Sequence, residues 1–296
     1  MSARVHLTAG AGALDLAPDL GAAITAWRVG GAPILRTADE AALARDGAGA
    51  AACFPMVPWV SRIRDGRFAF AGRNATLPPA PDGAQHSLHG LGWRTPWTVA
   101  TQRQTTVTLA QTYGPPDWPW RAEARFSLTL APSALRLDLT VANHDAAPMP
   151  AGLGFHPFFP RAPDTRLAAD LDGVWTMDAA GFPAAHASTL GAWDWRAPDG
   201  FPGAVLDNVF TGWRGAARLV TPSEGRAVSI TASETCDHLI VYAPPGTGFC
   251  CVEPVTSMTD AVNRAEGAAR TGLRTVAPGG ALSVWMQIDV AAAPAP

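Results

Sequence analysis

Residues 125–141 read RFSLTLAPSALRLDLTV, with apolar side chains at alternating positions on both sides of a central Ala-Pro-Ser. Alternation with a period of two is typical of a half-buried β-strand, because successive side chains of a strand point to opposite faces. Pro132 and Ser133 favour a turn between the two alternating segments. The sequence therefore predicts an antiparallel hairpin built from strands at 125–130 and 135–141.

The same alternation recurs at 106–110, 228–231 and 282–288. The 29 glycines and 27 prolines divide the chain into short segments, and helical periodicity is confined to weak candidates near 39–44 and 259–266. We predict an all-β protein of roughly twenty or more strands. A closed barrel and a large antiparallel β-sandwich of two sheets both accommodate that number, whereas a propeller would show a repeat period.

The absence of any Pro/Ser-rich linker predicts a single domain over residues 1–296, with a frayed tail at 291–296. The composition, 48% hydrophobic and 16% charged, is that of a soluble globular protein. The net charge of −3 gives no reason to expect nucleic acid or an anionic membrane as a partner. We expect a monomer or a homodimer.

All 22 basic residues are arginine, which excludes a Schiff-base lysine, pyridoxal-phosphate attachment and a phosphate-loop lysine. The N-terminus lacks a basic start followed by an apolar run, and no apolar run reaches the ~18 residues of a membrane span. The spacing of the cysteines is not that of metal ligands, so we expect no zinc site and free thiols in a reducing cytoplasm. The cysteines are Cys53, Cys236, Cys250 and Cys251.

Two polar islands lie in apolar, proline-containing sequence. Residues 154–159 (GFHPFF) surround His156, and residues 250–255 (CCVEPV) surround Glu253. Apolar surroundings raise the pKa of a carboxyl group and make it a better base at neutral pH. A histidine and a glutamate in such settings are the groups that acid–base catalysis requires. The other interpretations are a core histidine with a satisfied ring nitrogen and a buried salt bridge from Glu253 to an arginine such as Arg62.

A third island, residues 85–93 (QHSLHGLGW), contains His86 and His89 beside glycines that permit a close backbone approach. Trp93 and Trp97 offer flat faces for the C–H side of a sugar ring. The structural alternative is a loop histidine with satisfied hydrogen bonds. Whether His86 contributes to a site is left open by its context.

Two further polar positions have apolar neighbours. The guanidinium of Arg62 is a fixed fork of donors, which suits sugar hydroxyls or a carboxylate, and a buried structural ion pair is the alternative. Asp207 is, like Glu253, a carboxylate with apolar residues nearby. An Asx-turn would explain its position equally well. The pair Asp65-Gly66 predicts a hairpin turn, with solvent-exposed Arg64 and Arg67 on either side.

Five short motifs, in this order, resemble those of the aldose 1-epimerase (mutarotase) family. The resemblance runs from Val57 to Asn263. The motifs are Ser61-Arg62-Ile63, His89-Gly90-Leu91, His156-Pro157-Phe158-Phe159, Asp207 to Phe210, and Glu253-Pro254 with Asn263.

The resemblance implies a large antiparallel β-sandwich and a reaction that needs no cofactor and no metal. It implies Glu253 as general base and His156 as general acid, with His89, Arg62 and Asp207 binding hydroxyls of a monosaccharide. We add Trp93 to the predicted sugar contacts. The galactose-type members have Asn before the arginine, a second Gly after His-Gly, and Asn before the second histidine. This chain has Ser61, Leu91 and Phe155 there, which puts galactose as the substrate in question.

Exchange of α and β anomers requires a base at the C1 hydroxyl and an acid at the ring oxygen, with rotation about C1–C2 while the ring is open. We expect the negative charge of Glu253 to help keep His156 protonated. Three other functions are compatible with the residues. They are a mutarotase for sugar phosphates, for which Arg62, Arg64, Arg67 and Arg94 are available, a glycoside hydrolase using Glu253 and Asp207, and a non-catalytic sugar-binding protein.

Overall fold

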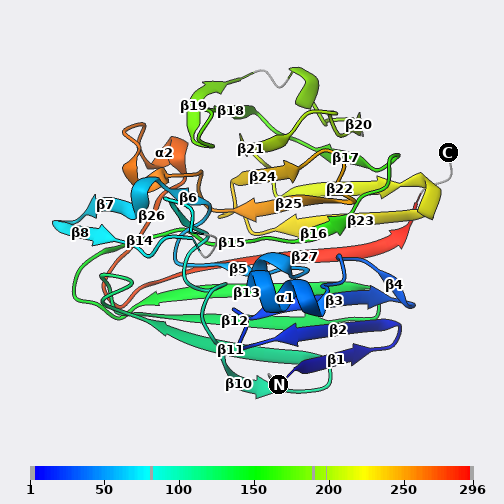
Figure 1. Ribbon diagram of the computed structural model, residues 1–296, viewed down its shortest axis with the longest axis horizontal. Helices are drawn as coiled ribbons and strands as arrows, with labels where there is room; N and C mark the ends of the chain where they lie inside the picture. Colours follow the sequence, from blue (N-terminus) through cyan, green and yellow to red (C-terminus); the bar gives the residue numbers. More distant parts are fainter. Residues whose placement is uncertain (1–3, 81–82, 189–190, 198, 294–296) are drawn as a thin grey trace.

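The computed structural model describes residues 4–80, 83–188, 191–197 and 199–293, and these form two large antiparallel sheets with smaller ones around them (Figure 1). The nine-stranded sheet has the order β10-β11-β12-β13-β27-β23-β22-β17-β20. The eight-stranded sheet has the order β19-β18-β21-β24-β25-β15-β5, and β16 also pairs with β25. Because neither sheet closes on itself within these residues, the molecule is a sandwich, and the prediction of an all-β antiparallel fold is confirmed.

The bounds of the strands follow, sheet by sheet. The nine-stranded sheet contains β10 (Thr98–Gln102), β11 (Thr106–Tyr113), β12 (Ala122–Leu130), β13 (Ala134–Asn143), β17 (Arg166–Ala169), β20 (Asp199–Gly200), β22 (Ala216–Thr221), β23 (Arg226–Ala232) and β27 (Ala281–Ala292). The other large sheet contains β5 (Pro55–Met56), β15 (Gly154–Phe155), β16 (Phe158–Pro160), β18 (Gly173–Met177), β19 (Pro183–Ala187), β21 (Leu206–Thr211), β24 (His238–Ala243) and β25 (Phe249–Val255). The smaller sheets contain β1 (Val5–Ala9), β2 (Gly12–Ala17), β3 (Ala23–Val29), β4 (Ala32–Pro33), β6 (Arg62–Ile63), β7 (Arg67–Phe70), β8 (Arg73–Thr76), β9 (Ser87–Leu88), β14 (Met149–Ala151) and β26 (Arg274–Val276).

The hairpin predicted from residues 125–141 is the pair β12 and β13. Phe126 pairs with Leu139, and Leu128 pairs with Leu137. All four side chains are buried in the main core between the two large sheets. The polar residue between the apolar ones, Thr129, is exposed, so the alternation read from the sequence is the alternation between core and solvent.

Helices are short. The helix α1 (Glu40–Asp46) begins after Asp39, whose side chain accepts hydrogen bonds from the backbone of Ala41 and Ala42, as an N-cap does. It matches the helical candidate near 39–44. The second candidate forms only a 3₁₀ turn, Ala261–Asn263, followed by the four-residue helix α2 (Ala268–Thr271). Neither α-helix within the described ranges is long and apolar enough to cross a membrane.

Two local predictions are wrong. The pair Asp65-Gly66 lies in a 3₁₀ turn, and the hairpin of β7 and β8 turns at Ala71-Gly72 instead. Both turn residues have positive φ (48° and 77°), as the two-residue turn that matches the right-handed strand twist requires. The tail predicted to be frayed from residue 291 is also ordered at its start, because Ala291 pairs with Ala227 in β23. Residues 294–296 lie outside the described part of the chain.

Within the eight-stranded sheet, the strand β25 is buried on both of its faces. Cys250 and Val252 point into the main core. Cys251 and Val255 belong instead to a second apolar cluster on the opposite face. Because side chains alternate along a strand, Glu253 lies on the face of this second cluster. Catalytic candidates therefore emerge on the outer face of the sheet, away from the sandwich interior.

The burial pattern of β12 predicts unequal costs for neighbouring substitutions. Leu128→Ala should lower the free energy of unfolding by about 2–5 kcal/mol, because it leaves a cavity in the main core. Thr129→Ala, on the exposed face of the same strand, should change it by less than about 0.5 kcal/mol. Urea unfolding of the two variants measures the difference, and equal losses would contradict the assigned faces.

Candidate active site

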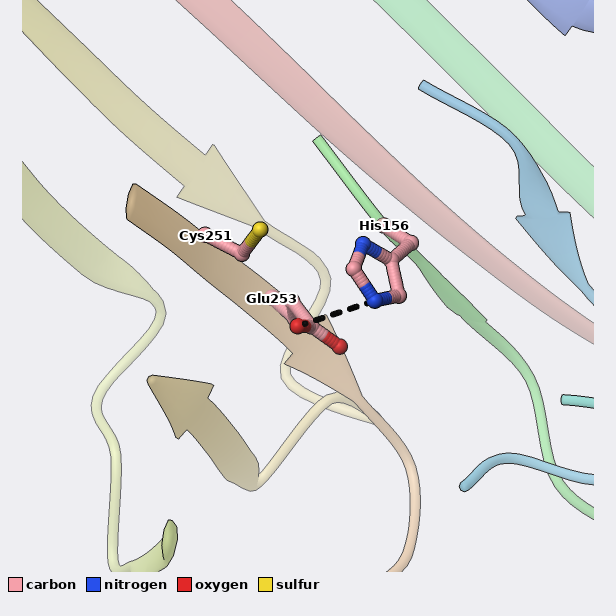
Figure 2. A group of neighbouring side chains, drawn as sticks. All are labelled: His156, Cys251 and Glu253. Atoms are coloured by element: carbon pink, nitrogen blue, oxygen red, sulfur yellow. Dashed lines mark ion pairs between the residues drawn. The ribbon is translucent and has the colours of Figure 1, made fainter. Parts of the chain in front are cut away.

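The register of β25 brings His156 and Glu253 together. Gly154 pairs with Val255, and Phe158 pairs with Cys251, so an antiparallel register places His156 directly opposite Glu253. The His156 Nε2 atom lies 3.4 Å from Glu253 Oε1 (Figure 2). Two residues separated by almost a hundred positions in the sequence thus form a facing pair.

The strand that carries His156 is interrupted at this residue, between β15 and β16. Pro157 has no N–H and cannot extend the ladder to β25. The N–H of His156 donates instead to the carbonyl oxygen of Phe54, at 3.0 Å, on the other side of the strand. The backbone around the imidazole is therefore held by β5 and β25 together.

Aromatic rings surround the imidazole of His156. Its centroid lies 4.7 Å from that of Phe54 and 4.5 Å from that of Phe158, both at low interplanar angles. The ring of His89 meets it edge-on at 5.0 Å. The side chains of His156 and Glu253 are 9% and 1% exposed, so little water reaches the pair.

Burial shifts the pKa of Glu253 upward. Loss of hydration raises the pKa of this carboxyl well above its usual value, the negative charge of Asp207 raises it further, and Arg62 acts in the opposite direction. The Oε2 atom of Glu253 is buried and has no hydrogen-bond partner in the described part of the structure. A buried carboxyl without full hydrogen bonding favours its neutral form.

Burial also shifts the pKa of the two histidines, in the other direction. The pKa of His156 is lowered by desolvation and then by the nearby charge of Arg36. The pKa of His89 is lowered by desolvation, by His156 and by Arg62. The direction of the His156 shift is opposite to the expectation that Glu253 helps keep His156 protonated, because desolvation is the largest cause of the lowered pKa. Burial thus favours the uncharged form of each member of the pair.

Arg62 and Asp207 form the polar side of the site. Arg62 Nη1 lies 3.4 Å from Asp207 Oδ2, and the two side chains are 32% and 33% exposed. Arg62 stands in β6 and Asp207 in β21, so the ion pair joins a surface loop region to the large sheet. Its partial exposure leaves donors and acceptors free for hydroxyl groups of a ligand.

The loop that positions His89 is conformationally strained. His89 and Ser61 both have positive φ, 55° and 54°, which is unfavourable for residues other than glycine. The His89 N–H donates to the Ser61 carbonyl at 2.9 Å. At Gly90 a Cβ atom would collide with the carbonyl oxygen of Val57, so only glycine permits this approach.

Three other residues in or next to this island have different positions. Trp93 is buried; it stacks on Phe54 at 5.1 Å and donates from Nε1 to the Leu88 carbonyl, so it supports the aromatic wall. Trp97 packs in the main core and cannot contact a sugar. His86 accepts a hydrogen bond from the N–H of Asp65 and contacts Phe182, outside the facing pair.

The loop 178–182 forms one wall beside Arg62. Asp178 binds Arg64 at 3.3 Å, and the guanidinium of Arg64 lies 3.9 Å from the ring centre of Phe182. Gly181 approaches Arg62 so closely that a Cβ would lie 3.3 Å from its Nη1 atom. Arg64 is exposed, as predicted from the sequence, but it has a specific role in anchoring this loop.

Sequence reasoning missed two residues of the site. Arg36 follows β4 and places its guanidinium 3.5 Å from the ring centre of Phe158, with Nε and Nη2 bonded to loop carbonyls. No local pattern marks it, because its partners are distant in the sequence. Tyr242 pairs in register with both Asp207 and Cys251 and shares their face. The alternation of β24 provided a signal for Tyr242.

A family model described as aldose 1-epimerase matches residues 3–289. The chain belongs to the aldose 1-epimerase family. It is 30% identical over 266 residues to the uncharacterized protein YphB of Escherichia coli, covering 87% of this chain and 89% of YphB. The resemblance inferred from the five motifs is thereby confirmed.

Solved structures agree with this membership. An Escherichia coli protein provisionally described as an aldose 1-epimerase superposes with a TM-score of 0.89 at 27% identity, over 98% of this chain and 99% of the other. A galactose mutarotase-like protein from Clostridium acetobutylicum gives 0.84 at 18% identity, over 98% and 95%. The latter similarity shows the shared fold.

The raised pKa of Glu253 predicts how stability changes with pH. The folded state holds this proton more tightly than the unfolded state, so the stabilisation is complete below the unfolded pKa of about 4.3. It is lost as the pH rises through the folded-state pKa, by up to about 1.4 kcal/mol per pH unit. Urea unfolding between about pH 5 and pH 8 should show wild type losing stability relative to Glu253→Gln. A difference independent of pH would contradict the shifted pKa.

Proposed function

We propose that the protein is a mutarotase that interconverts the α and β anomers of a free monosaccharide by acid–base ring opening and closure. The observation that supports this most directly is the 3.4 Å separation of His156 Nε2 and Glu253 Oε1 in an almost dry setting. An imidazole and a carboxyl that face each other can serve the two oxygens on one hemiacetal carbon. Glu253 is assigned as general base and His156 as general acid.

Movement of one proton within the pair reconciles these roles with the pKa shifts of Glu253 and His156 in the sugar-free site. A neutral carboxyl with a neutral imidazole and a carboxylate with an imidazolium have the same total charge and differ only in the position of one proton. A bound sugar brings hydroxyl dipoles that hydrogen-bond to the charged groups and replace the missing hydration, which favours the ion-pair form. The ligand thereby prepares the acid and the base that act on it.

The reaction then proceeds in balanced steps. The Glu253 carboxylate takes the proton from the C1 hydroxyl while the His156 imidazolium gives its proton to the ring oxygen, and the bond from C1 to that oxygen breaks. The aldehyde turns about C1–C2 and presents its other face. The former ring hydroxyl attacks C1, returning its proton to His156, and Glu253 reprotonates the carbonyl oxygen. Both groups end as they began.

Binding is assigned to Arg62, Asp207 and His89, with Trp93 as a predicted contact for the sugar ring. The ion pair between Arg62 and Asp207 supplies both donors and acceptors at the partly exposed side of the site. His89 is buried against His156, and its lowered pKa favours the neutral imidazole, which can donate or accept a hydrogen bond. These residues would fix the sugar over the facing pair.

A neutral sugar is favoured over a sugar phosphate by the way the nearby arginines are engaged. Arg62 is paired with Asp207, and Arg64 with Asp178. A phosphate site would require arginines whose charge is not already balanced. Anomer exchange is likewise favoured over glycoside hydrolysis, because the second carboxyl, Asp207, is bound to an arginine. A pure binding protein has no need of a buried acid and base in contact.

Removing the base tests the assignment. Glu253→Gln should lower kcat by about a hundred- to ten-thousand-fold, because the amide keeps the shape but accepts no proton. KM should stay close to the wild-type value, since ground-state contacts are preserved. Polarimetry of freshly dissolved α-anomers of glucose, galactose, xylose and arabinose measures both constants, and wild-type turnover in the variant would refute the role of Glu253.

The same panel separates the competing functions. Thr129→Ala, remote on the exposed face of β12, serves as the control with unchanged activity. A hexose 6-phosphate that reacts faster than the free hexose would support a sugar-phosphate enzyme. Release of nitrophenol from nitrophenyl glycosides would support a hydrolase. Sugar binding without acceleration of mutarotation would leave only a binding protein.

The ion pair at the partly exposed side gives a different prediction. Asp207→Asn should raise KM by about tenfold or more, because it removes a charged acceptor for sugar hydroxyls and loosens Arg62. The effect on kcat should be smaller than that of Glu253→Gln. Steady-state polarimetry over a range of sugar concentrations distinguishes the two constants, and a loss confined to kcat would move Asp207 into the proton-transfer machinery.

A further inference from the structure

We propose that His156, Cys251 and Glu253 form a binding site for a soft divalent cation such as Zn²⁺, and that the bound ion inhibits the enzyme reversibly. The three side chains are buried and offer a nitrogen, a sulfur and an oxygen (Figure 2). That combination is typical of zinc ligands. Inhibition follows because the ion would occupy the acid and the base at once, so this part of the proposal rests on the proposed function.

The geometry is close to that of a tetrahedral site. Bonds of about 2.0–2.3 Å to a tetrahedral ion imply separations of about 3.3–3.7 Å between ligand atoms. His156 Nε2 and Glu253 Oε1 lie 3.4 Å apart. All three ligand atoms lie within 4.8 Å of one another, and coordination would draw them together to these tetrahedral separations.

Strand alternation explains why the sulfur is available. Cys251 and Glu253 are two positions apart on β25 and share one face, while the side chain of Cys250, also in β25, points the other way into the main core. The proposed ligands are thus Cys251 and Glu253, from one face of β25, and His156, which lies opposite Glu253. Cysteine spacing alone could not reveal this site, and the proposal revises the expectation that the cysteines have no role in metal binding.

The unmet hydrogen-bonding capacity of the pair favours a cation. Glu253 Oε2 is buried with no partner within the described residues. A divalent ion would coordinate this carboxylate and satisfy its buried oxygen. Binding would release the proton of the Cys251 thiol to solvent, and burial, which raises the pKa of this thiol, opposes that step. Arg36, close enough to affect both His156 and Cys251, opposes binding, so moderate affinity is expected.

Ligand softness sets the selectivity. A thiolate and an imidazole favour Zn²⁺ or Co²⁺, whereas Mg²⁺ and Ca²⁺ prefer oxygen ligands. With three protein ligands, a fourth position is left for water or a sugar hydroxyl. Because the ion and the sugar need the same two side chains, Zn²⁺ should compete with the substrate.

The test titrates Zn²⁺ and Co²⁺ into the whole protein and into two serine variants. Cys251→Ser should weaken binding of the ion by about tenfold or more, and Cys250→Ser, its buried neighbour on the opposite face, should bind like wild type. Co²⁺ should give a thiolate-to-cobalt charge-transfer band in wild type and Cys250→Ser that is absent from Cys251→Ser. Cys251→Ala replaces the serine variant if the latter does not fold.

The spectral and calorimetric readouts do not depend on activity, so failure of the proposed function and failure of the ion site are distinguishable. Zinc binding that requires Cys251, with competitive inhibition of mutarotation, would support the proposal in full. Zinc binding with no detectable mutarotation would support the site and refute the enzyme. Absence of the charge-transfer band, or equal zinc affinity in Cys251→Ser and wild type, would overturn the ion site.

Discussion

The contact between His156 and Glu253 is the constraint around which the outer face of the eight-stranded sheet is built. Two ionisable groups are held 3.4 Å apart with almost no solvent, and Oε2 of the glutamate lacks a hydrogen bond. Such an arrangement destabilises a fold unless the surrounding structure imposes it. Here the main core supplies that stability independently, because it lies on the opposite face of the same strands.

The separation of the main core from the candidate site depends on the pairing register of β25. In β25 the residues facing inward complete the packing between the large sheets, and the residues facing outward include Glu253 of the candidate site. A slip of one residue would exchange the two sets, placing Val252 or Pro254 opposite His156 and a charged side chain in the main core. The strands on both sides of β25, with Pro157 interrupting one of them, fix the alignment that avoids this.

The sequence predicted those parts of the molecule that depend on local pattern. Alternation located β12 and β13, and an ionisable residue in apolar sequence located His156 and Glu253. It could not locate Arg36, whose partner Phe158 is reached only through the folded chain. Nor could the sequence predict the lowered pKa of His156. Desolvation depends on the aromatic rings that pack around the imidazole only in the folded chain.

The hairpin turn predicted at Asp65-Gly66 was wrong for a related reason. Asp65-Gly66 has the composition of a hairpin turn, yet the turn is made by Ala71-Gly72. The Asp65 region is engaged elsewhere: its N–H donates to His86, and Asp260 accepts from the N–H of Arg64. Long-range hydrogen bonds of this kind override the local preference.

The loop 178–182 can change independently of the facing pair. It is the tip of the hairpin of β18 and β19, and it contacts the candidate site through the ion pair between Asp178 and Arg64 and the close approach of Gly181 to Arg62. His156 and Glu253 lie outside this hairpin, at β15–β16 and in β25. Under the proposed function, substitutions in this tip alter the surroundings of Arg62, and with them sugar binding, while the positions of His156 and Glu253 stay the same.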